Sequence, residues 1–339
     1  MTMKHYIEKC IERENLTVEE AANALDLIMT NQASDVQIAG LLIALRAKGE
    51  TVEEIVGFAT TMRARSVTVT LEDPDAIDMC GTGGDGLGTF NISTVSSLVA
   101  AGAGVTVAKH GNRSVSSRSG SADLLTALGV NIQQTPERVQ ECINTVGVGF
   151  LFAPMFHPAM KFVAKPRGEL GVRTIFNILG PITNPAGVTK QLVGAYQEDV
   201  ASRLATALGH LGTRKACIVH SEDGMDEVAL SGNTAVYEVG GDGSVRKYVV
   251  SPASFGLPPH ALASLRGGNA EENAAIALAL LNKEQGPSRD VVVANAAFGI
   301  YVAGKAGSLA EARALAADSI DSGAALAVLK KFVEFTCKP

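Results

Sequence analysis

A glycine-rich segment at residues 81–86 (GTGGDG) constrains the fold of this chain more than any other feature. It follows a short, mostly apolar run at residues 76–79 and precedes residues 91–94 (NIST), which have the pattern of a helix start. Glycines allow backbone N–H groups to approach an anion closely, and the N-terminus of a helix adds its dipole. We therefore interpret this strand–loop–helix unit as an anion-binding loop of an α/β protein, with an ordinary flexible turn as the alternative.

The neighbouring residues narrow the identity of the anion. Residues 81–86 satisfy the dinucleotide pattern G-x-G-x-x-G, but such a site also requires an acidic residue about 20 positions later, at the end of the next strand. Here that strand ends in Lys109 and His110, which disfavours NAD. The chain contains no G-x-x-x-x-G-K-[ST] segment, which excludes a P-loop.

Strand-like and helix-like segments alternate from residue 71 onward. The apolar pattern predicts strands at 105–108, 149–153, 191–196 and 215–220, helices at 121–128 and 201–211, and a hairpin at 234–250. This alternation is typical of βαβ units around a mostly parallel sheet. The chain beyond residue 269 returns to a helical pattern.

The first 70 residues predict a bundle of short helices. Three capping boxes occur in order, because a Ser or Thr is followed three residues later by Glu or Gln at Thr17, Ser34 and Thr51. Apolar residues follow each box at helical spacing, and no strand pattern interrupts them. We expect antiparallel helices separated by short turns.

Composition and charge exclude several classes of protein. The chain has 339 residues, a formal net charge of −6 and no tryptophan, so it lacks the basic surface and the aromatic platforms of a nucleic-acid binder. Its five cysteines are scattered without a C-x-x-C pair, which indicates a cytoplasmic location. No apolar stretch approaches the ~20 residues of a membrane span, and the N-terminal segment lacks the apolar core of a signal peptide.

A second polar cluster lies at residues 109–123 (KHGNRSVSSRSGSAD). It holds three cations, five serines and two glycines, and it leads into a predicted helix. Cationic donors, hydroxyls and a helix N-terminus together suit a phosphate or pyrophosphate. A solvated loop is the alternative.

Two further segments carry candidate chemistry. Residues 156–185 place Arg167 and Arg173 among apolar side chains, which suits an aromatic carboxylate, although surface ion pairs are the favoured explanation of the two arginines taken alone. Residues 221–227 (SEDGMDE) hold four carboxylates, which suit Mg²⁺ bridging to a phosphate, although a solvated acidic turn is the alternative. Because no nucleophile motif or zinc-like spacing occurs, we expect displacement on a metal-held phosphate ester without a covalent enzyme intermediate.

Together these motifs resemble the anthranilate phosphoribosyltransferases. The resemblance rests on GTGGDG and NIST (81–94), KHGNRSVSSRSGSAD (109–123), HPAM…RGELGVRTIFNILGPITNP (157–185) and the Asp-Glu pair (226–227). It implies transfer of phosphoribose from phosphoribosyl pyrophosphate to the amine of anthranilate, giving N-(5-phosphoribosyl)anthranilate and pyrophosphate in tryptophan biosynthesis. It also implies Mg²⁺ as cofactor, a homodimer, and no nucleic-acid or membrane partner.

The implied fold is the nucleoside phosphorylase/phosphoribosyltransferase type. A small N-terminal helical domain (1–70) serves dimerisation and part of the acceptor site, and it is hinged to a larger α/β domain (71–339) with a mostly parallel central sheet. Residues 157–185 are expected to pack back on the helical domain.

The resemblance implies three sets of site residues and no covalent or general-base residue. Phosphoribosyl pyrophosphate is held by Gly81, Gly84, Asp85, Thr89, Asn91, Ile92, Ser93, Thr94, Lys109, Asn112, Arg113, Ser117 and Ser121. Anthranilate is held or lined by Gly81, His110, Asn112, His157, Arg167 and Gly180. Mg²⁺ is held by Ser93, Asp226 and Glu227. One departure is Gly168, where many relatives carry a basic or polar residue.

Two alternatives stay open. A pyrimidine-nucleoside phosphorylase shares the architecture and also binds a sugar phosphate, but the GTGGDG and KHGN segments fit it less well. Some non-enzymatic relatives of this fold bind nucleic acid, and these would need a basic face that an acidic chain does not suggest.

Overall fold

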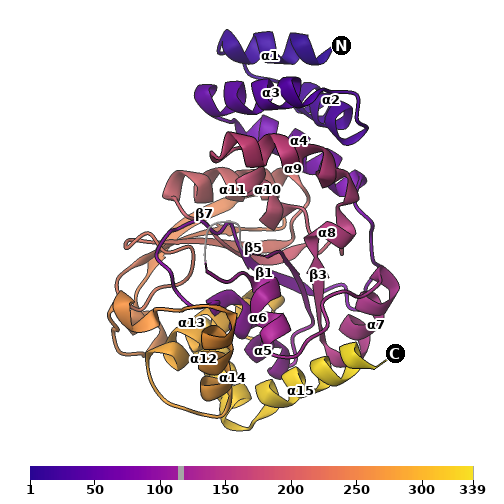
Figure 1. Ribbon diagram of the computed structural model, residues 1–339. Coiled ribbons are helices and arrows are strands. Elements are labelled where there is room, and N and C mark those ends of the chain that lie inside the picture. Colours follow the sequence, from indigo (N-terminus) through magenta and orange to yellow (C-terminus); the bar gives the residue numbers. More distant parts are fainter. Residues whose placement is uncertain (114–117, 339) are drawn as a thin grey trace.

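Four helices at the N-terminal end form a bundle that lies at one end of the molecule (Figure 1). The computed structural model describes residues 1–113 and 118–338. The bundle consists of α1 (Met3–Ile11), α2 (Val18–Met29), α3 (Asp35–Lys48) and α4 (Val52–Ala64). The three predicted capping boxes are confirmed. The side chains of Thr17, Ser34 and Thr51 each accept a hydrogen bond from the third helical N–H, and the Glu or Gln side chain at that third position accepts one from the backbone N–H of the capping residue.

A seven-stranded sheet forms the centre of the molecule, and the prediction of a mostly parallel sheet is confirmed. Its strand order is β3-β2-β1-β4-β5-β6-β7. The first five strands in this order are parallel, and the last two add antiparallel pairs. Their bounds are β1 Ile77–Gly81, β2 Val107–Gly111, β3 Val148–Phe152, β4 Lys190–Gly194, β5 Lys215–Ser221, β6 Thr234–Val239 and β7 Val245–Val250.

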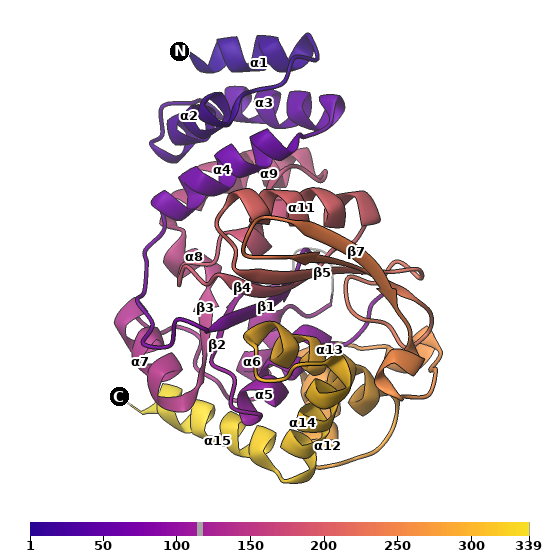
Figure 2. The same cartoon turned by 180° about the vertical axis from the view of Figure 1, so that it is seen from behind.

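Helices cover both faces of the sheet (Figures 1 and 2). The face away from the bundle packs against helices that include most of the C-terminal part of the chain: α5 Ile92–Gly102, α6 Ser121–Ala127, α12 Ala270–Leu281, α13 Pro287–Ala303, α14 Leu309–Asp321 and α15 Ala324–Cys337. The other face packs against α11 (Glu198–His210), and α7 (Pro136–Val146) lies beside β3. Short 3₁₀ turns η3 (Pro252–Phe255) and η4 (Leu262–Leu265) follow the hairpin.

The segment from 153 to 182, for which the sequence predicts no regular structure beyond the end of a strand, folds into short helices between the sheet and the bundle. They are α8 Ala153–Phe156, η1 Pro158–Met160, α9 Lys161–Leu170, α10 Phe176–Leu179 and η2 Gly180–Ile182. Helix α9 packs against α3, and the Phe176 ring meets Phe58 of α4 edge-on at 6.3 Å between centroids. One apolar core therefore runs from the bundle through α10 and α11 to the sheet.

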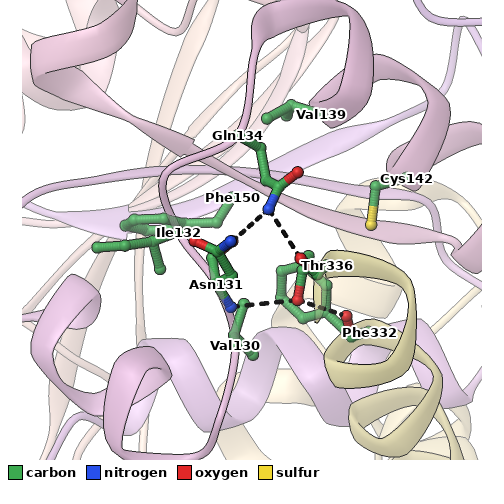
Figure 3. A pocket seen from close by; sticks show the side chains of 9 residues that line it. All are labelled: Val130, Asn131, Ile132, Gln134, Val139, Cys142, Phe150, Phe332 and Thr336. Carbon is green, nitrogen blue, oxygen red and sulfur yellow. Dashed lines mark hydrogen bonds between the residues drawn. The ribbon is translucent and has the colours of Figure 1, made fainter. Parts of the chain in front are cut away.

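The C-terminal helix is anchored by polar contacts beside a small cavity (Figure 3). Gln134 Nε2 donates to the Thr336 carbonyl at 2.9 Å, and the Asn131 N–H donates to the Thr336 hydroxyl at 3.2 Å. The cavity is lined by Val130, Asn131, Ile132, Gln134, Val139, Cys142, Phe150, Phe332 and Thr336. None of these belongs to the predicted site, so we assign the cavity to packing. No described helix is long and apolar enough to cross a membrane.

Candidate active site

The predicted anion-binding loop lies where the order of the sheet reverses. The chain runs from β1 outward to β2 and β3 on one side, and then returns to β4 and β5 on the other, so the crevice between β1 and β4 is the topological switch point where α/β sheets bind ligands. Within the loop, Gly83, Gly84 and Gly86 have φ of +65°, +80° and +75°. Only glycine adopts these angles without strain, which explains the glycine-rich sequence.

The acidic segment packs directly against the ends of both switch-point strands. A Cβ on Gly194, the last residue of β4, would lie 1.6 Å from the Asp226 carbonyl oxygen. A Cβ on Gly81, the last residue of β1, would lie 2.6 Å from Asp226 Oδ2. Both strands end in glycine because no side chain fits between them and Asp226.

The two adjacent carboxylates accept hydrogen bonds from the anion-binding backbone. Asp226 Oδ2 accepts from the Gly83 N–H at 2.8 Å, and Glu227 Oε1 accepts from the Ser93 N–H in the first turn of α5 at 2.9 Å. The predicted helix start at residues 91–94 is confirmed, since α5 begins at Ile92 with Asn91 at the N-cap position, but the Asn91 side chain makes no capping bond. Its Oδ1 accepts from Asn273 at 2.9 Å instead, so the anion at the helix N-terminus is Glu227.

Burial makes this acidic pair costly to ionise. Burial, and then the charge of Asp85, raises the pKa of Asp226 to about 7. Burial, and then the charge of Asp226, raises the pKa of Glu227 to about 8. Asp85 Oδ2 is buried without a hydrogen-bond partner in the described chain. These oxygens fit a divalent cation, which would neutralise them.

A cation bound here would take its remaining ligands from outside the protein. No group of three or more His, Cys, Asp or Glu residues within 1–113 and 118–338 is arranged as a complete metal cage. Mg²⁺ is commonly bound in this way, by one or two carboxylates together with waters and substrate phosphates.

The second predicted loop begins at the end of β2. Asn112 and Arg113 are exposed; Arg113 Nη1 pairs with Asp123 Oδ1 at 2.8 Å, and the Ser121 hydroxyl donates to the Asn112 carbonyl at 3.1 Å. Ser117 lies outside the described residues. The loop therefore presents donors close to the N-terminus of α6.

Three other predicted donor-site residues lie around the start of α5. Ile92 and Thr94 are 1% and 2% exposed, and the Ile92 side chain belongs to the apolar core, so only its backbone can serve a ligand. Thr89 is half-buried and forms an isolated β-bridge with Arg266.

Strand β2 separates two sides of the site, because successive side chains of a strand point to opposite faces. The Lys109 ammonium is buried and donates to the Met79 carbonyl of β1, and its charge favours ionisation of Glu227. The next side chain, His110, contacts the opposite group of residues: its Nδ1 lies 3.1 Å from the Gly180 carbonyl.

A pair of neutral histidines lines this opposite side. The His110 and His157 ring centroids are 5.2 Å apart, and each Nε2 is buried without a hydrogen-bond partner in the described residues. Burial, and then the neighbouring His157, lowers the pKa of His110 to about 3, and burial lowers the pKa of His157 to about 4. Since Nδ1 of His110 must donate to the Gly180 carbonyl, its Nε2 carries a lone pair.

Arg167 lies on α9, and its stacking partner Phe176 begins the helix α10 that leads to Gly180. Its guanidinium stacks over the Phe176 ring at 5.2 Å, and burial lowers its pKa. Within the described part of the chain, neither Arg167 nor Arg173 has a carboxylate at salt-bridge distance, so the alternative of surface ion pairs is wrong. A Cβ on the neighbouring Gly168 would meet nothing within 4 Å, so a side chain would fit there.

Arg173, for which the sequence indicated a carboxylate contact, and two residues that the sequence reasoning missed join these parts. Arg173 donates to the Gly84 carbonyl and stacks over Tyr196 at 4.2 Å, which connects the residues after α9 to the glycine loop. Asp78 and Asn184 are both buried, and they bond to each other at 2.8 Å beneath the site. The only signal in the sequence was a carboxylate within an otherwise apolar strand.

This fold and this site define the class of two-domain glycosyl transferases. Residues 73–326 match a family model described as the α/β domain of a glycosyl transferase family, and residues 4–66 match the helical bundle domain of the same family.

The chain belongs to the anthranilate phosphoribosyltransferase family. It is 53% identical over 331 residues to the anthranilate phosphoribosyltransferase of Moorella thermoacetica, covering 98% of this chain and 97% of that protein. The solved structure of the Thermus thermophilus enzyme superposes with a TM-score of 0.92 at 46% identity, covering 98% and 99% of the two chains. The Saccharomyces cerevisiae enzyme in complex with PRPP and Mg superposes with a TM-score of 0.90 at 29% identity, covering 98% and 97%.

The close packing at Gly194 yields a test of the acidic pair. In Gly194→Ala the new Cβ must displace the Asp226 backbone by about an ångström or more, and we expect transferase activity to fall on the order of 100-fold. Steady-state rates measure the loss. The matched control is Gly307→Ala, whose Cβ would meet only Glu311 Oε2 at 3.6 Å and should keep full activity. Equal activity of the two variants would contradict this role of Gly194.

Proposed function

We propose that this chain transfers phosphoribose from phosphoribosyl pyrophosphate to the amine of anthranilate, releasing pyrophosphate, as a step of tryptophan biosynthesis. The observation that carries the proposal is the placement of a glycine loop and a buried acidic pair on one side of β2 and a neutral histidine pair on the other. Arg167 stacks over Phe176 in the segment that leads to the Gly180 contact of His110. The Saccharomyces cerevisiae relative supports both halves, since its structures hold PRPP with Mg in one complex and 4-fluoroanthranilate in another.

The donor side would bind the pyrophosphate through backbone N–H groups and cations. The N–H groups of Gly83 and Ser93 already bond carboxylate oxygens, which supports their capacity to bond phosphate oxygens. Lys109 would place its charge beside the leaving group. The wider set comprises Gly81, Gly84, Asp85, Thr89, Asn91, Ile92, Thr94, Asn112, Arg113, Ser117 and Ser121.

Ser93, Asp226 and Glu227 would hold Mg²⁺. When bound, the cation neutralises the pyrophosphate and stabilises the charge that develops on it as the bond to the anomeric carbon breaks. The raised pKa of each carboxyl supports this assignment, because a buried acidic pair without a cation partner is unfavourable when ionised.

The acceptor side would orient anthranilate. Arg167 would bind the carboxylate, with Asn112 and Gly81 near the ring, and His110, His157 and Gly180 would line the path to the anomeric carbon. The neutral imidazoles place no positive charge beside a nitrogen that becomes cationic as the new bond forms. The aromatic amine is neutral at pH 7, so positioning and exclusion of water contribute most of the rate and no strong base is needed.

We also propose that the enzyme is a cytoplasmic homodimer joined through its helical domain. Exposed apolar side chains on α1 and α3 support the interface, with Ile11 67%, Val36 82% and Ile43 41% exposed. All five cysteines are free, which supports a reducing compartment. We place the domain boundary between residues 70 and 71. The contact of α9 with α3 supports the proposal that the helical bundle forms part of the acceptor site.

Anthranilate fluorescence tests the function directly. We expect the fluorescence to disappear when phosphoribosyl pyrophosphate and Mg²⁺ are added to enzyme and anthranilate, because the amine becomes glycosylated. Phosphorolysis of a pyrimidine nucleoside without this loss would favour the phosphorylase alternative. An unchanged signal together with retention on heparin would favour a nucleic-acid-binding module.

The same assay tests the carboxylate contact. Arg167→Ala should raise the KM for anthranilate about 10- to 100-fold, the range of one charged hydrogen bond, and change the KM for phosphoribosyl pyrophosphate far less. Lys161→Ala removes an exposed cation from the same helix and is the matched control. Equal effects of Arg167→Ala on the two KM values would contradict its role with anthranilate.

The raised carboxyl pKa values predict how Mg²⁺ stabilises the protein at different pH. Folding raises the pKa of Asp226 and Glu227 to about 7 and 8. The free energy of unfolding therefore falls as the pH rises through these values and the buried carboxyls lose their protons, and a bound cation restores it by compensating their charge. The increase in melting temperature caused by Mg²⁺ with phosphoribosyl pyrophosphate should therefore be larger at pH 8 than at pH 6.

Calorimetry of Asp226→Asn combined with Glu227→Gln is the control for this measurement. The double variant should lose both the pH dependence and most of the Mg²⁺-dependent activity. An unchanged Mg²⁺ titration in the variant would refute the assignment of the metal ligands.

A further inference from the structure

The two strands β1 and β2, which lead into the two predicted ligand loops, lie side by side but lose their backbone pairing toward their carboxyl ends. Within the described residues, β1 and β2 are paired at one position, Ile77 with Val107, whereas β1 and β4 are paired along the whole of β1. Beyond that position side chains bridge the strands. The His110 N–H donates to Asp78 Oδ1 at 3.1 Å, and the Lys109 ammonium donates to the Met79 carbonyl.

Asp78 provides the acceptor that the missing strand pairing would otherwise supply. A buried backbone N–H requires a partner, and the His110 N–H finds it in this carboxylate. Asp78 is fully buried, which raises its pKa, and the nearby charge of Lys109 is the largest influence in the opposite direction. A buried carboxylate is costly, and an apolar residue with continued strand pairing would be the simpler way to build this core.

The same carboxylate also holds the loop that borders the acceptor side. Asp78 Oδ2 accepts from Asn184 Nδ2 at 2.8 Å, and Asn184 Nδ2 also donates to the Ala108 carbonyl of β2 at 2.8 Å. Asn184 ends the segment that begins at Gly180, whose carbonyl accepts from His110. Asp78 therefore touches both the end of β2 and the loop that fixes the histidine ring.

We propose, on the basis of the function above, that Asp78 is a positioning residue for the transfer reaction. Its carboxylate accepts from the His110 N–H in place of a β1 carbonyl, and this leaves the Met79 carbonyl of β1 to hold the Lys109 ammonium beside the donor site. Through Asn184 it also fixes the 180–184 loop against His110. One buried carboxyl group thus sets the relative placement of the two substrates.

Asp78→Asn is the most direct test, because it conserves volume and keeps one acceptor oxygen. Its amide N–H₂ must face either the His110 N–H or the Asn184 amide, and Lys109 loses its buried counter-charge. We expect kcat to fall at least 10-fold, and the Kd for phosphoribosyl pyrophosphate with Mg²⁺, measured by calorimetry, to rise at least 5-fold.

Asn184→Ala separates the two sides of the site. It removes the connection to the acceptor loop and leaves the charge of Asp78 beside Lys109. We expect the KM for anthranilate to rise at least 5-fold while the Kd for phosphoribosyl pyrophosphate stays within 2-fold. If Asp78→Asn does not fold, the Asn184→Ala variant decides alone. A raised KM for anthranilate with an unchanged Kd for phosphoribosyl pyrophosphate supports the proposal, and the absence of this difference overturns it.

The matched control is Asp75→Asn, which removes surface ion pairs with Lys190 and Arg214, each at 3.0 Å. It should lower the melting temperature without changing kcat or either affinity. A folded Asp78→Asn enzyme with kcat, Kd and KM all within 2-fold of the unmodified enzyme overturns the proposal, whatever its melting temperature. Absence of transfer by the unmodified chain contradicts the proposed function instead.

Discussion

The contact of Asp226 with the ends of β1 and β4 is the constraint on which the donor side depends. It requires glycine at both strand ends, and it directs two carboxylates at N–H groups of the glycine loop and of α5. The site thus holds negative charge where an anion is expected to bind. Burial raises the pKa of both carboxyls, with a further contribution from Asp85 at Asp226 and from Asp226 at Glu227, so the arrangement is favourable only when a cation or protons compensate.

The acceptor side depends on the helical bundle in a similar way. Arg167 is carried by α9, which packs against α3, and its stacking partner Phe176 contacts Phe58 of α4. The apolar core is continuous from the bundle to α11 and the sheet. The bundle therefore helps to determine where Arg167, the proposed contact for the acceptor carboxylate, lies, even though it contributes none of the predicted site residues.

Patterns within short segments predicted many of the helices and strands of this fold. They did not predict the features that depend on contacts between distant segments. The three capping boxes and the mostly parallel character of the sheet follow from spacing within short segments. The cap of α5 could not be found in this way, because Glu227 lies 134 residues from Ser93. Strand β2 spans Val107–Gly111, whereas the apolar pattern predicted 105–108, since the polar residues Lys109 and His110 continue the strand. Asp78 escaped notice because a single sequence does not show where the backbone pairing of two strands ends.

Strand β2 divides the titratable groups by the chemistry that each side requires. On the donor side Lys109, Asp226 and Glu227 are ionisable groups whose charges can balance a metal and a pyrophosphate. On the acceptor side the histidines are held neutral by burial, and Arg167 is the cation available to a carboxylate. An aromatic acid with a neutral amine matches this division, because in the proposed site its single negative charge would meet the arginine and its nitrogen would meet uncharged imidazoles. Adjacent residues of one strand, Lys109 and His110, keep these two environments a fixed distance apart.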